Sequence, residues 1–144
     1  MNTYHYVFII ISFNNLTLSI YIYRFRIVHV SSEEADFPAS ELDRNNPQTV
    51  GWLSQKYCEY PQEIGLKLEK GIPRLKQVMI LSHQTKIPRK VELFVGNGKE
   101  YFNAKYKRLG FLPFDDNSRS NYSAREVKSA YIDNLGNFLK IIIH

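Results

Sequence analysis

The last twenty residues constrain the fold of this chain more than any other segment, because they are patterned as two β-strands. Arg125–Ile132 roughly alternates polar with apolar side chains, and Phe138–Ile143 is apolar and rich in β-branched residues. Asp133–Gly136 supplies turn residues between them, which predicts an antiparallel hairpin. Only Lys140 and His144 would protect the apolar last strand from pairing with another chain. We therefore expect either a domain cut from a longer protein or one that another strand completes.

The composition favours a sheet protein with one core. Tyrosine, phenylalanine, isoleucine, leucine and valine are abundant while alanine is scarce, a bias toward strands. A chain of 144 residues is long enough to bury a core without disulfide or metal help. Cys58 is the single cysteine, so no intrachain disulfide and no two-cysteine zinc motif can form, which fits a reducing cytoplasm.

Short apolar or alternating runs separated by turn residues predict the remaining strands. In Pro61–Leu68 the side chains of Ile64, Leu66 and Leu68 fall on one face, as those of Val91, Leu93 and Val95 do in Arg89–Val95. Tyr101–Arg108 is predicted as a helical turn or a tyrosine-rich loop, and Ser31–Val50 as a long connection. With the final pair, about seven short strands and no long amphipathic helix indicate an all-β antiparallel sandwich or jelly roll. The other predicted strands are Phe25–Val30, Leu75–Leu81 and Leu109–Phe114.

Residues 1–24 differ from the rest and are treated as an apolar extension, with the domain spanning residues 25–144. The apolar runs Val7–Phe13 and Leu16–Tyr23 lack the positive start of a secretory signal, and two asparagines between them argue against a membrane span. Two interpretations stay open. The segment is a β-hairpin turning at Asn14-Asn15, which would supply the missing strand, or it is not a native part of the domain.

Charge is unevenly distributed along the chain, whose net charge is +5. Residues 31–66 carry seven Asp/Glu against two Lys/Arg, and residues 67–108 carry eleven Lys/Arg against three Asp/Glu. If these halves occupy different faces, the domain is suited to orient on a charged protein partner. The basic segment also suggests nucleic-acid binding as a function, but no DNA- or RNA-binding motif accompanies it, so no nucleic-acid partner is expected.

Two groups of residues are candidates for binding. The first is a predicted strand end and the following loop, because loops at the ends of such sandwiches commonly carry recognition; a solvated basic hairpin is the alternative. The second lies on the last-but-one strand, where Arg125 could instead form an internal salt bridge to Glu41 or Glu63. The first group is His83, Gln84, Lys86, Arg89 and Lys90, and the second is Arg125 and Tyr131.

Catalytic chemistry has little support in the sequence. The candidates His5, His29, His83, His144 and Cys58 show no nucleophile-elbow or cysteine-centred signature, so no enzyme and no catalytic residue is expected. Cys58 is expected to be a small buried apolar residue. Asp115-Asp116 is short of a calcium loop, so neither a metal nor a cofactor is expected.

Trp52 is the only tryptophan and follows a turn in the long connection. It could serve as a platform for stacking a sugar or an arginine. We favour the alternative, a plug that closes one end of the sandwich core.

Several separated blocks follow one another along the chain, among them Pro61–Ile64, Leu81–Gln84, Arg108–Phe111 and Ala124–Asp133. In this order they closely resemble one family, the N-terminal domain of the centrosomal protein of 104 kDa. The resemblance spans Phe25–His144 and implies a jelly roll related to galactose-binding and discoidin domains. It departs in two ways: the family's domain continues past the position of His144 into another strand, and the family's coiled-coil, tubulin-binding and zinc-finger regions are absent.

The resemblance implies a function in protein interaction. The expected module belongs to a microtubule-associated protein of the cytoplasm and cytoskeleton, at the centrosome or cilium, and binds a protein of the ciliary tip or centriole. Tubulin binding is not expected from this domain alone, and no membrane partner is expected. The competing hypothesis is a module that binds carbohydrate or another small ligand, as its discoidin relatives do.

Overall fold

The computed structural model describes residues 6–14, 20–22, 25–44, 49–69, 72 and 74–144. Within them the chain forms ten strands and two short 3-10 helices, η1 (Ala39–Asp43) and η2 (Ser118–Ser120). The strands are β1 (Tyr6–Asn14), β2 (Ile20–Ile22), β3 (Phe25–Val30), β4 (Trp52–Leu53), β5 (Gln62–Leu68), β6 (Arg74–Ser82), β7 (Lys90–Asn97), β8 (Lys105–Pro113), β9 (Val127–Leu135) and β10 (Phe138–Ile143).

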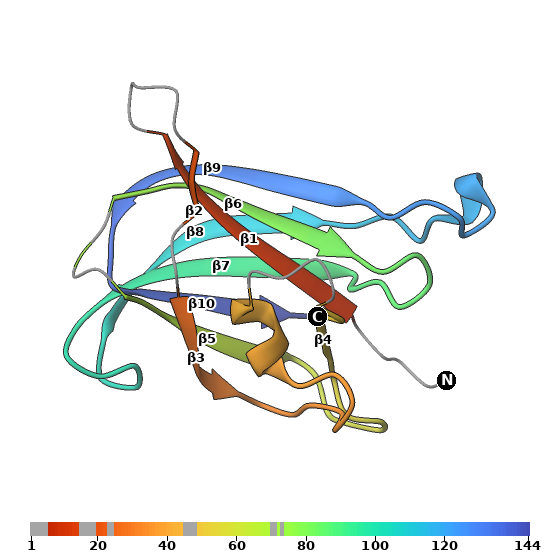
Figure 1. Cartoon of the computed structure of the whole chain (residues 1–144), viewed down its shortest axis with the longest axis horizontal. Coiled ribbons are helices and arrows are strands. Elements are labelled where there is room, and N and C mark those ends of the chain that lie inside the picture. The colour runs from red at the N-terminus through yellow and green to blue at the C-terminus, as the bar shows by residue number, and fades with distance from the viewer. Residues whose placement is uncertain (1–5, 15–19, 23–24, 45–48, 70–71, 73) are drawn as a thin grey trace.

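The strands build two antiparallel sheets that pack face to face (Figure 1). Sheet A has the order β2-β1-β6-β9, with β4 paired to β1, and sheet B has the order β3-β5-β10-β7-β8. The predicted antiparallel sandwich is therefore confirmed. β6 and β8 both end at the same end of the sandwich, and the loops that follow them begin there. The candidate site lies at this end.

The predicted C-terminal hairpin is wrong. β9 pairs with β6 in sheet A, whereas β10 crosses to sheet B and lies between β5 and β7. The expected open edge is wrong as well, because β10 is hydrogen-bonded on both sides. The apolar run of Phe138–Ile143 suits this place, since four of its six side chains are buried.

The core lies between the two sheets. The alternating faces predicted for β5 and β7 are confirmed: Ile64, Leu66 and Leu68 are buried, as are Val91, Leu93 and Val95. From β10, Leu139, Ile141 and Ile143 join them. These inward-facing branched side chains form one continuous hydrophobic cluster that holds the sheets together.

Trp52 is the core plug that the sequence favoured. Its side chain is fully buried in the hydrophobic cluster, and its indole Nε1 donates a hydrogen bond of 3.0 Å to the carbonyl oxygen of Ser32. The Ser32 hydroxyl also donates to Gln62 Oε1 at 2.5 Å and accepts from the backbone nitrogen of Gln55 at 3.2 Å. The long connection is therefore held against the core by polar contacts although it has little regular structure.

Other predicted elements differ in their bounds. β8 begins at Lys105, four residues before the predicted strand, because the tyrosine-rich segment forms a turn that leads directly into it. β4 was not predicted, since two residues carry no periodicity. β1 pairs with β2 and β6, with Asn14 opposite Ile20, so the segment between them is longer than a two-residue turn. The division of the chain at residue 24 stays a prediction.

The outer face of sheet B carries an aromatic cap. Glycines at two positions leave room for tyrosine rings to lie flat against the strands: a Cβ on Gly65 would be 2.5 Å from Tyr101 Cε2, and one on Gly96 would be 2.5 Å from Tyr106 Cε1. The Tyr101 hydroxyl donates to Glu63 Oε1 at 2.7 Å, and its ring meets Phe138 edge-on at 5.8 Å between ring centroids. The loop between β7 and β8 is thereby fixed on one half of this face.

Candidate functional site

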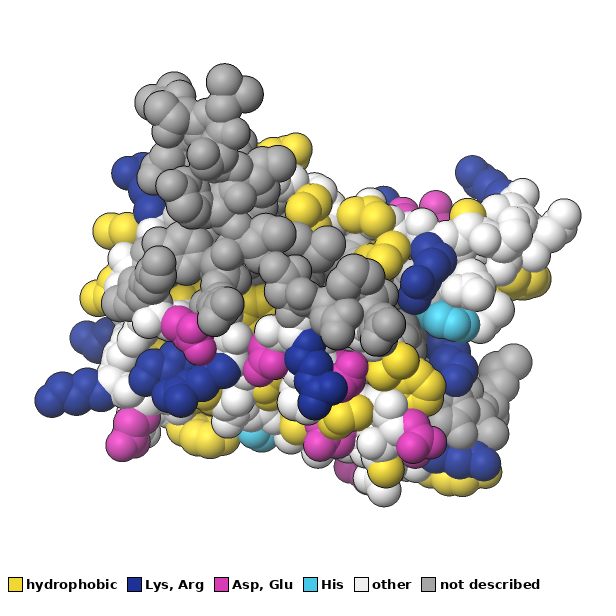
Figure 2. All heavy atoms as spheres, in the orientation of Figure 1, with side chains coloured by type: hydrophobic (Ala, Val, Ile, Leu, Met, Phe, Trp, Pro, Cys, Tyr) yellow, Lys and Arg dark blue, Asp and Glu magenta, His cyan; other side chains and the backbone are white. Residues whose placement is uncertain are grey.

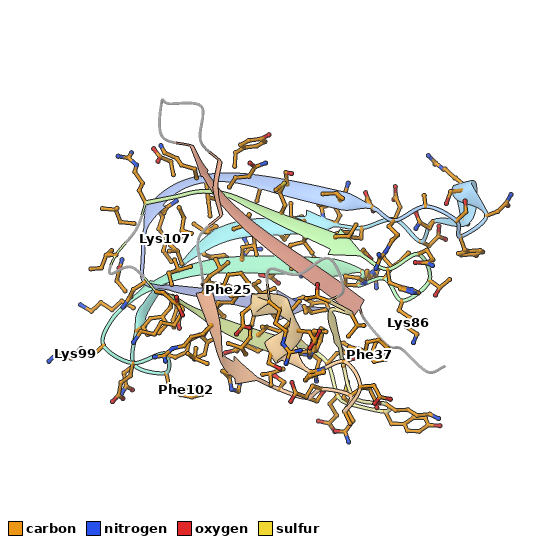
Figure 3. All side chains as sticks on the ribbon, in the orientation of Figure 1. Phe25, Phe37, Lys86, Lys99, Phe102 and Lys107 are labelled. Carbon is orange, nitrogen blue, oxygen red and sulfur yellow. The ribbon has the colours of Figure 1, made fainter. Side chains whose placement is uncertain are left out.

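One hollow at the end of the sandwich, which we call the end hollow, brings together five residues from three segments. Its volume is about 270 Å³. Three of its residues come from the connection between β6 and β7, one precedes β9 and one lies in the connection before η1. Figure 3 shows Phe37 and Lys86 at this end of the molecule and Lys99 and Phe102 at the opposite end. The lining residues are Phe37, His83, Gln84, Lys86 and Arg125.

The backbone around the end hollow is held in place by specific hydrogen bonds. The backbone nitrogen of Ser82 donates to the carbonyl oxygen of Glu126 at 2.9 Å, which joins the ends of β6 and β9. Asn117 Nδ2 donates to the carbonyl oxygen of Ala124 at 2.6 Å and to that of Gln84 at 3.4 Å. The segments that carry Gln84 and Arg125 are therefore fixed relative to each other.

His83 stabilises the turn that carries Lys86. Its Nδ1 accepts from the backbone nitrogens of Thr85 and Lys86 at 3.2 Å and 3.3 Å. Burial lowers the pKa of His83, and the positive charges of Arg125 and Lys86 lower it further. The imidazole is therefore neutral at neutral pH, with Nδ1 as the acceptor and Nε2 carrying the proton.

The end hollow is cationic, whereas the face of the molecule seen in Figure 2 carries both basic and acidic side chains. Among the described residues that line it, Lys86 and Arg125 are positively charged and none is acidic. Glu126, next to Arg125 in sequence, bonds instead to Lys128 Nζ at 2.8 Å. Two cations beside an aromatic ring and an amide suit a ligand in which an anionic group is attached to an apolar or aromatic group.

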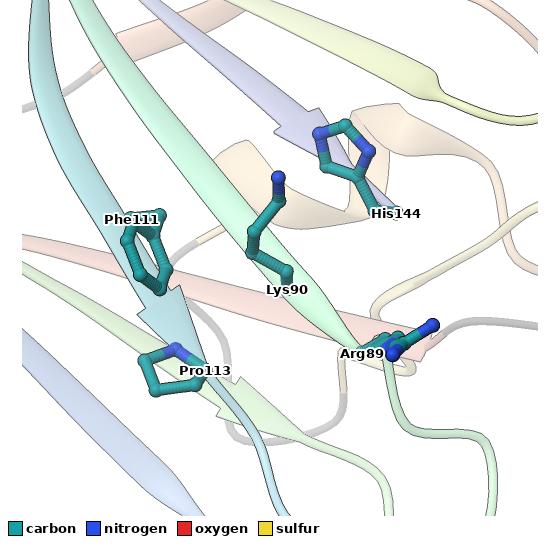
Figure 4. A pocket seen from close by; sticks show the side chains of 5 residues that line it. All are labelled: Arg89, Lys90, Phe111, Pro113 and His144. Atoms are coloured by element: carbon teal, nitrogen blue, oxygen red, sulfur yellow. The ribbon is translucent and has the colours of Figure 1, made fainter.

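The structure divides the first predicted group of binding residues between two hollows. Arg89 and Lys90 lie outside the end hollow, because Lys90 starts β7 and its side chain lies on the outer face of sheet B. There they line a separate hollow of about 440 Å³, the outer groove (Figure 4). In Figure 4, Lys90 stands between Phe111 and His144. The outer groove is lined by Arg89, Lys90, Phe111, Pro113 and His144.

The second predicted group is also divided. Arg125 joins the end hollow, but Tyr131 lies on β9 opposite Gln77, with 82% of its surface exposed, and lines neither hollow. The carboxylates named as partners for Arg125 bond elsewhere: Glu41 bonds to Arg44 Nη1 at 2.7 Å, and Glu63 bonds to the Tyr101 hydroxyl. The sequence did not predict that Arg125 lies beside His83 and Lys86.

Phe37, Phe111 and Pro113 were not predicted as lining residues. Each belongs to a segment far in sequence from the predicted binding residues that line the same hollow, and its residue type did not identify it. His144 was named only as an edge residue and a possible catalytic one. Only the topology, which places β8, β7 and β10 side by side, brings it next to Lys90.

A carboxylate next to the outer groove organises the cations around it. Glu92 lies 2.9 Å from Lys90 Nζ, 2.9 Å from Arg108 Nε and 2.9 Å from His144 Nε2. Hydrogen bonds from Lys90 and Arg108 lower the pKa of Glu92 from 4.5 to about 2. Because the folded state holds this carboxylate ionised, the ion pairs stabilise the fold above pH 4.5 and are lost as the pH falls toward 2.

Replacing Glu92 with glutamine is therefore expected to lower the melting temperature at pH 7 and to have little effect near pH 2. Thermal unfolding of both proteins followed by circular dichroism at the two pH values measures this difference. Glu100→Gln, in an exposed loop, is the matched control and should change neither value. An equal deficit of Glu92→Gln at both pH values would show that the carboxylate acts through shape and not through charge.

Other groups with chemical potential are dispersed. His29 lies beside Glu63, with Nε2 to Oε1 at 3.9 Å, and His144 lies beside Glu92. Cys58 is half-buried, so the expectation of a buried cysteine is wrong. Within the described ranges, no three His, Cys, Asp or Glu residues gather in a way that could hold a metal ion. His5 lies outside the described residues. None of the helices that the structure describes has the length and hydrophobicity to cross a membrane.

Sequence comparison relates the chain to centrosomal proteins. A family model described as "Centrosomal protein CEP104, N-terminal domain" matches residues 51–144. Three proteins named "Centrosomal protein of 104 kDa", from Homo sapiens, Rattus norvegicus and Mus musculus, are each 37% identical to it over 125 residues. The match covers 83% of this chain but only 13% of each relative's length.

Structure comparison identifies the type of sandwich. The family 32 CBM from Clostridium perfringens NanJ, solved with galactose, matches with a TM-score of 0.61 and 16% identity, over 83% of this chain and 81% of that one. CpGH89CBM32-5 of the same organism, solved with GalNAc-β-1,3-galactose, matches with a TM-score of 0.59 and 18% identity, over 83% and 84%. The fold is a jelly roll of the galactose-binding or discoidin-like type, as expected; at this identity the likeness concerns the fold alone.

Proposed function

Because this chain belongs to the family of the CEP104 N-terminal domain, we propose that it is a non-catalytic module through which a centrosomal and ciliary-tip protein binds a protein partner. The relatives are named centrosomal proteins, and the proposed place of action is the cytoskeleton, at the centrosome or cilium. Tubulin, nucleic acid and membrane are not the proposed partners of this domain.

The observation that carries the proposal is the end hollow. It gathers Lys86 and Arg125, 39 positions apart in sequence, beside the ring of Phe37. Hydrogen bonds fix the backbone segments that carry the two cations relative to each other before any partner arrives. A preformed cationic pocket next to an aromatic ring suits a carboxylate-bearing segment of a partner protein.

Binding without catalysis is the better account of these side chains. The described residues that line the end hollow include no hydroxyl or thiol that could serve as a nucleophile. Among the described lining residues, His83 carries the one imidazole, and its Nδ1 already accepts two backbone hydrogen bonds of its own turn. The side chains present are thus suited to hold an anionic group rather than to transform one.

The test reverses the charge of the end hollow. The double variant Lys86→Glu and Arg125→Glu is expected to capture its partner from extracts of ciliated cells at least about tenfold less efficiently, because opposite charges become like charges. A tagged form should also lose its enrichment at centrosomes and ciliary tips. Lys99→Glu, at the opposite end of the molecule, is the matched control. Unchanged capture and localisation of the double variant would remove the end hollow from consideration.

A small carbohydrate is the second candidate ligand. Two solved structures with the same fold are complexes with galactose and with GalNAc-β-1,3-galactose, and the end hollow offers an aromatic ring beside amide, imidazole and guanidinium groups. Titration with each sugar, followed by thermal unfolding, decides between the candidates. A saturable rise in melting temperature that Arg125→Glu abolishes would reverse the order of preference.

A further inference from the structure

The outer face of sheet B is distinct from the end hollow, and only half of it is covered. The cap of Tyr101 and Tyr106 lies over one half, where Gly65 and Gly96 provide the space. Lys140 is part of this covered region, since its Nζ lies 4.0 Å from the centroid of the Tyr106 ring. The outer groove is on the other half, where the Phe111 side chain is exposed to solvent.

Apolar side chains flank Glu92 on the floor of the uncovered half. Strand register places Ile142, Glu92 and Phe111 in one row across β10, β7 and β8, and Phe94 in the row toward the cap. Phe111 has 53% of its surface exposed, although a large apolar side chain on a sheet is usually covered. Pro113 extends the apolar surface along β8 and lies opposite Lys90.

Cations surround this floor. The side chains of Lys90 and Arg108 lie about equally far from the Phe111 ring, at 5.9 Å and 6.0 Å from its centroid. Both also pair with Glu92, and 36% and 50% of their respective side-chain surfaces remain exposed to solvent. Arg89 lines the same groove, so this half carries three cations beside the carboxylate of Glu92.

We propose that the uncovered half of this face binds an acidic peptide segment in an extended conformation. Apolar side chains of the peptide pack on Phe111 and Pro113, and its carboxylates pair with Lys90 and Arg108. Side chains of like direction repeat at about 6 to 7 Å along an extended strand. An extended peptide with an apolar residue at one position and an acidic residue two positions away can therefore present the first to the ring and the second to the cations. The proposal does not rest on the function proposed for the end hollow.

The experiment uses the whole chain, labelled with ¹⁵N, and a synthetic peptide of about twelve residues in which glutamates flank one phenylalanine and one leucine. Amide shifts are expected to cluster at Lys90, Glu92, Phe111 and Ile142. A peptide with serine in place of both apolar residues should bind more weakly, and one with lysine in place of glutamate should not bind. Shifts centred on His83 and Arg125 instead would overturn the proposal without affecting the end hollow's own test.

Variants establish which side chains carry the binding. By fluorescence anisotropy, Arg108→Gln is expected to weaken binding about tenfold and Phe111→Ala about fivefold, whereas Phe111→Tyr keeps the ring and the affinity. Arg119→Gln, in η2, removes the same charge elsewhere and is the matched control. Equal losses for Arg108→Gln and Arg119→Gln would reveal attraction by net charge alone and overturn the proposal. So would saturable binding to phosphatidylserine vesicles without binding of the peptide. Because Arg108→Gln also loses its ion pair with Glu92, the variant and the native chain are compared well below both melting temperatures, which separates lost binding from lost folding.

Discussion

Replacing Trp52 with alanine is expected to lower the free energy of unfolding by about 3 to 5 kcal/mol, a large part of the stability of a domain of this size. The indole is fully buried between the sheets, so its removal leaves a cavity lined by core side chains. It also leaves the carbonyl oxygen of Ser32 without its Nε1 donor. Urea unfolding followed by circular dichroism measures the loss.

Trp52→Phe separates the two contributions. Phenylalanine fills most of the space but cannot donate to Ser32, so we expect a loss smaller than that of the alanine variant. Tryptophan fluorescence cannot follow unfolding of either variant, since Trp52 is the only tryptophan. An alanine variant within about 1 kcal/mol of the native protein would mean that the indole does not close the core.

Replacing Gly65 with alanine is expected to lower the free energy of unfolding by about 1 to 3 kcal/mol. The new methyl group would enter the space of the Tyr101 ring, since its carbon would lie 2.5 Å from Cε2 and 2.8 Å from the hydroxyl oxygen. The ring cannot simply turn away, because its hydroxyl bonds to Glu63 and its edge packs on Phe138. Equilibrium unfolding in urea quantifies the effect.

A double-mutant cycle with Tyr101→Ala tests this cause. Once the ring is removed, the methyl group has room, so the penalty of Gly65→Ala should nearly vanish in the Tyr101→Ala background. An undiminished penalty in that background would place its origin in the backbone of β5 and not in the contact with the ring. The same cycle at Gly96 and Tyr106 serves as an independent repeat at the other tyrosine of the cap.

The sequence indicated which strands exist but not which of them pair. Alternation in Pro61–Leu68 and Arg89–Val95 predicted their inward faces, because the period of two follows from strand geometry alone. It failed at the C-terminus, since pairing depends on contacts between segments far apart in sequence. The apolar residues on both faces of Phe138–Ile143 indicate a strand inside a sheet, a clue that counts for more than the turn residues before it.

The candidate site was half predictable for a similar reason. Lys86 and Lys90 were grouped because they are close in sequence, yet one lies in a loop and the other on a strand face, so they line different hollows. Arg125 was assigned to a separate group, and the pairing of the ends of β6 and β9 brings it to His83. Charge and residue type predicted the cations, whereas the aromatic surfaces beside them depend on topology.

The central place of β10 in sheet B has a consequence for the order of folding. Of the strands in that sheet, β10 comes last along the chain, and its neighbours β5 and β7 do not touch each other without it. During synthesis, the pairs β3–β5 and β7–β8 therefore remain unconnected until β10 has been synthesised and pairs with both β5 and β7. Such late, long-range closure is slow, and it leaves apolar strand edges open to chaperones and to aggregation in the meantime.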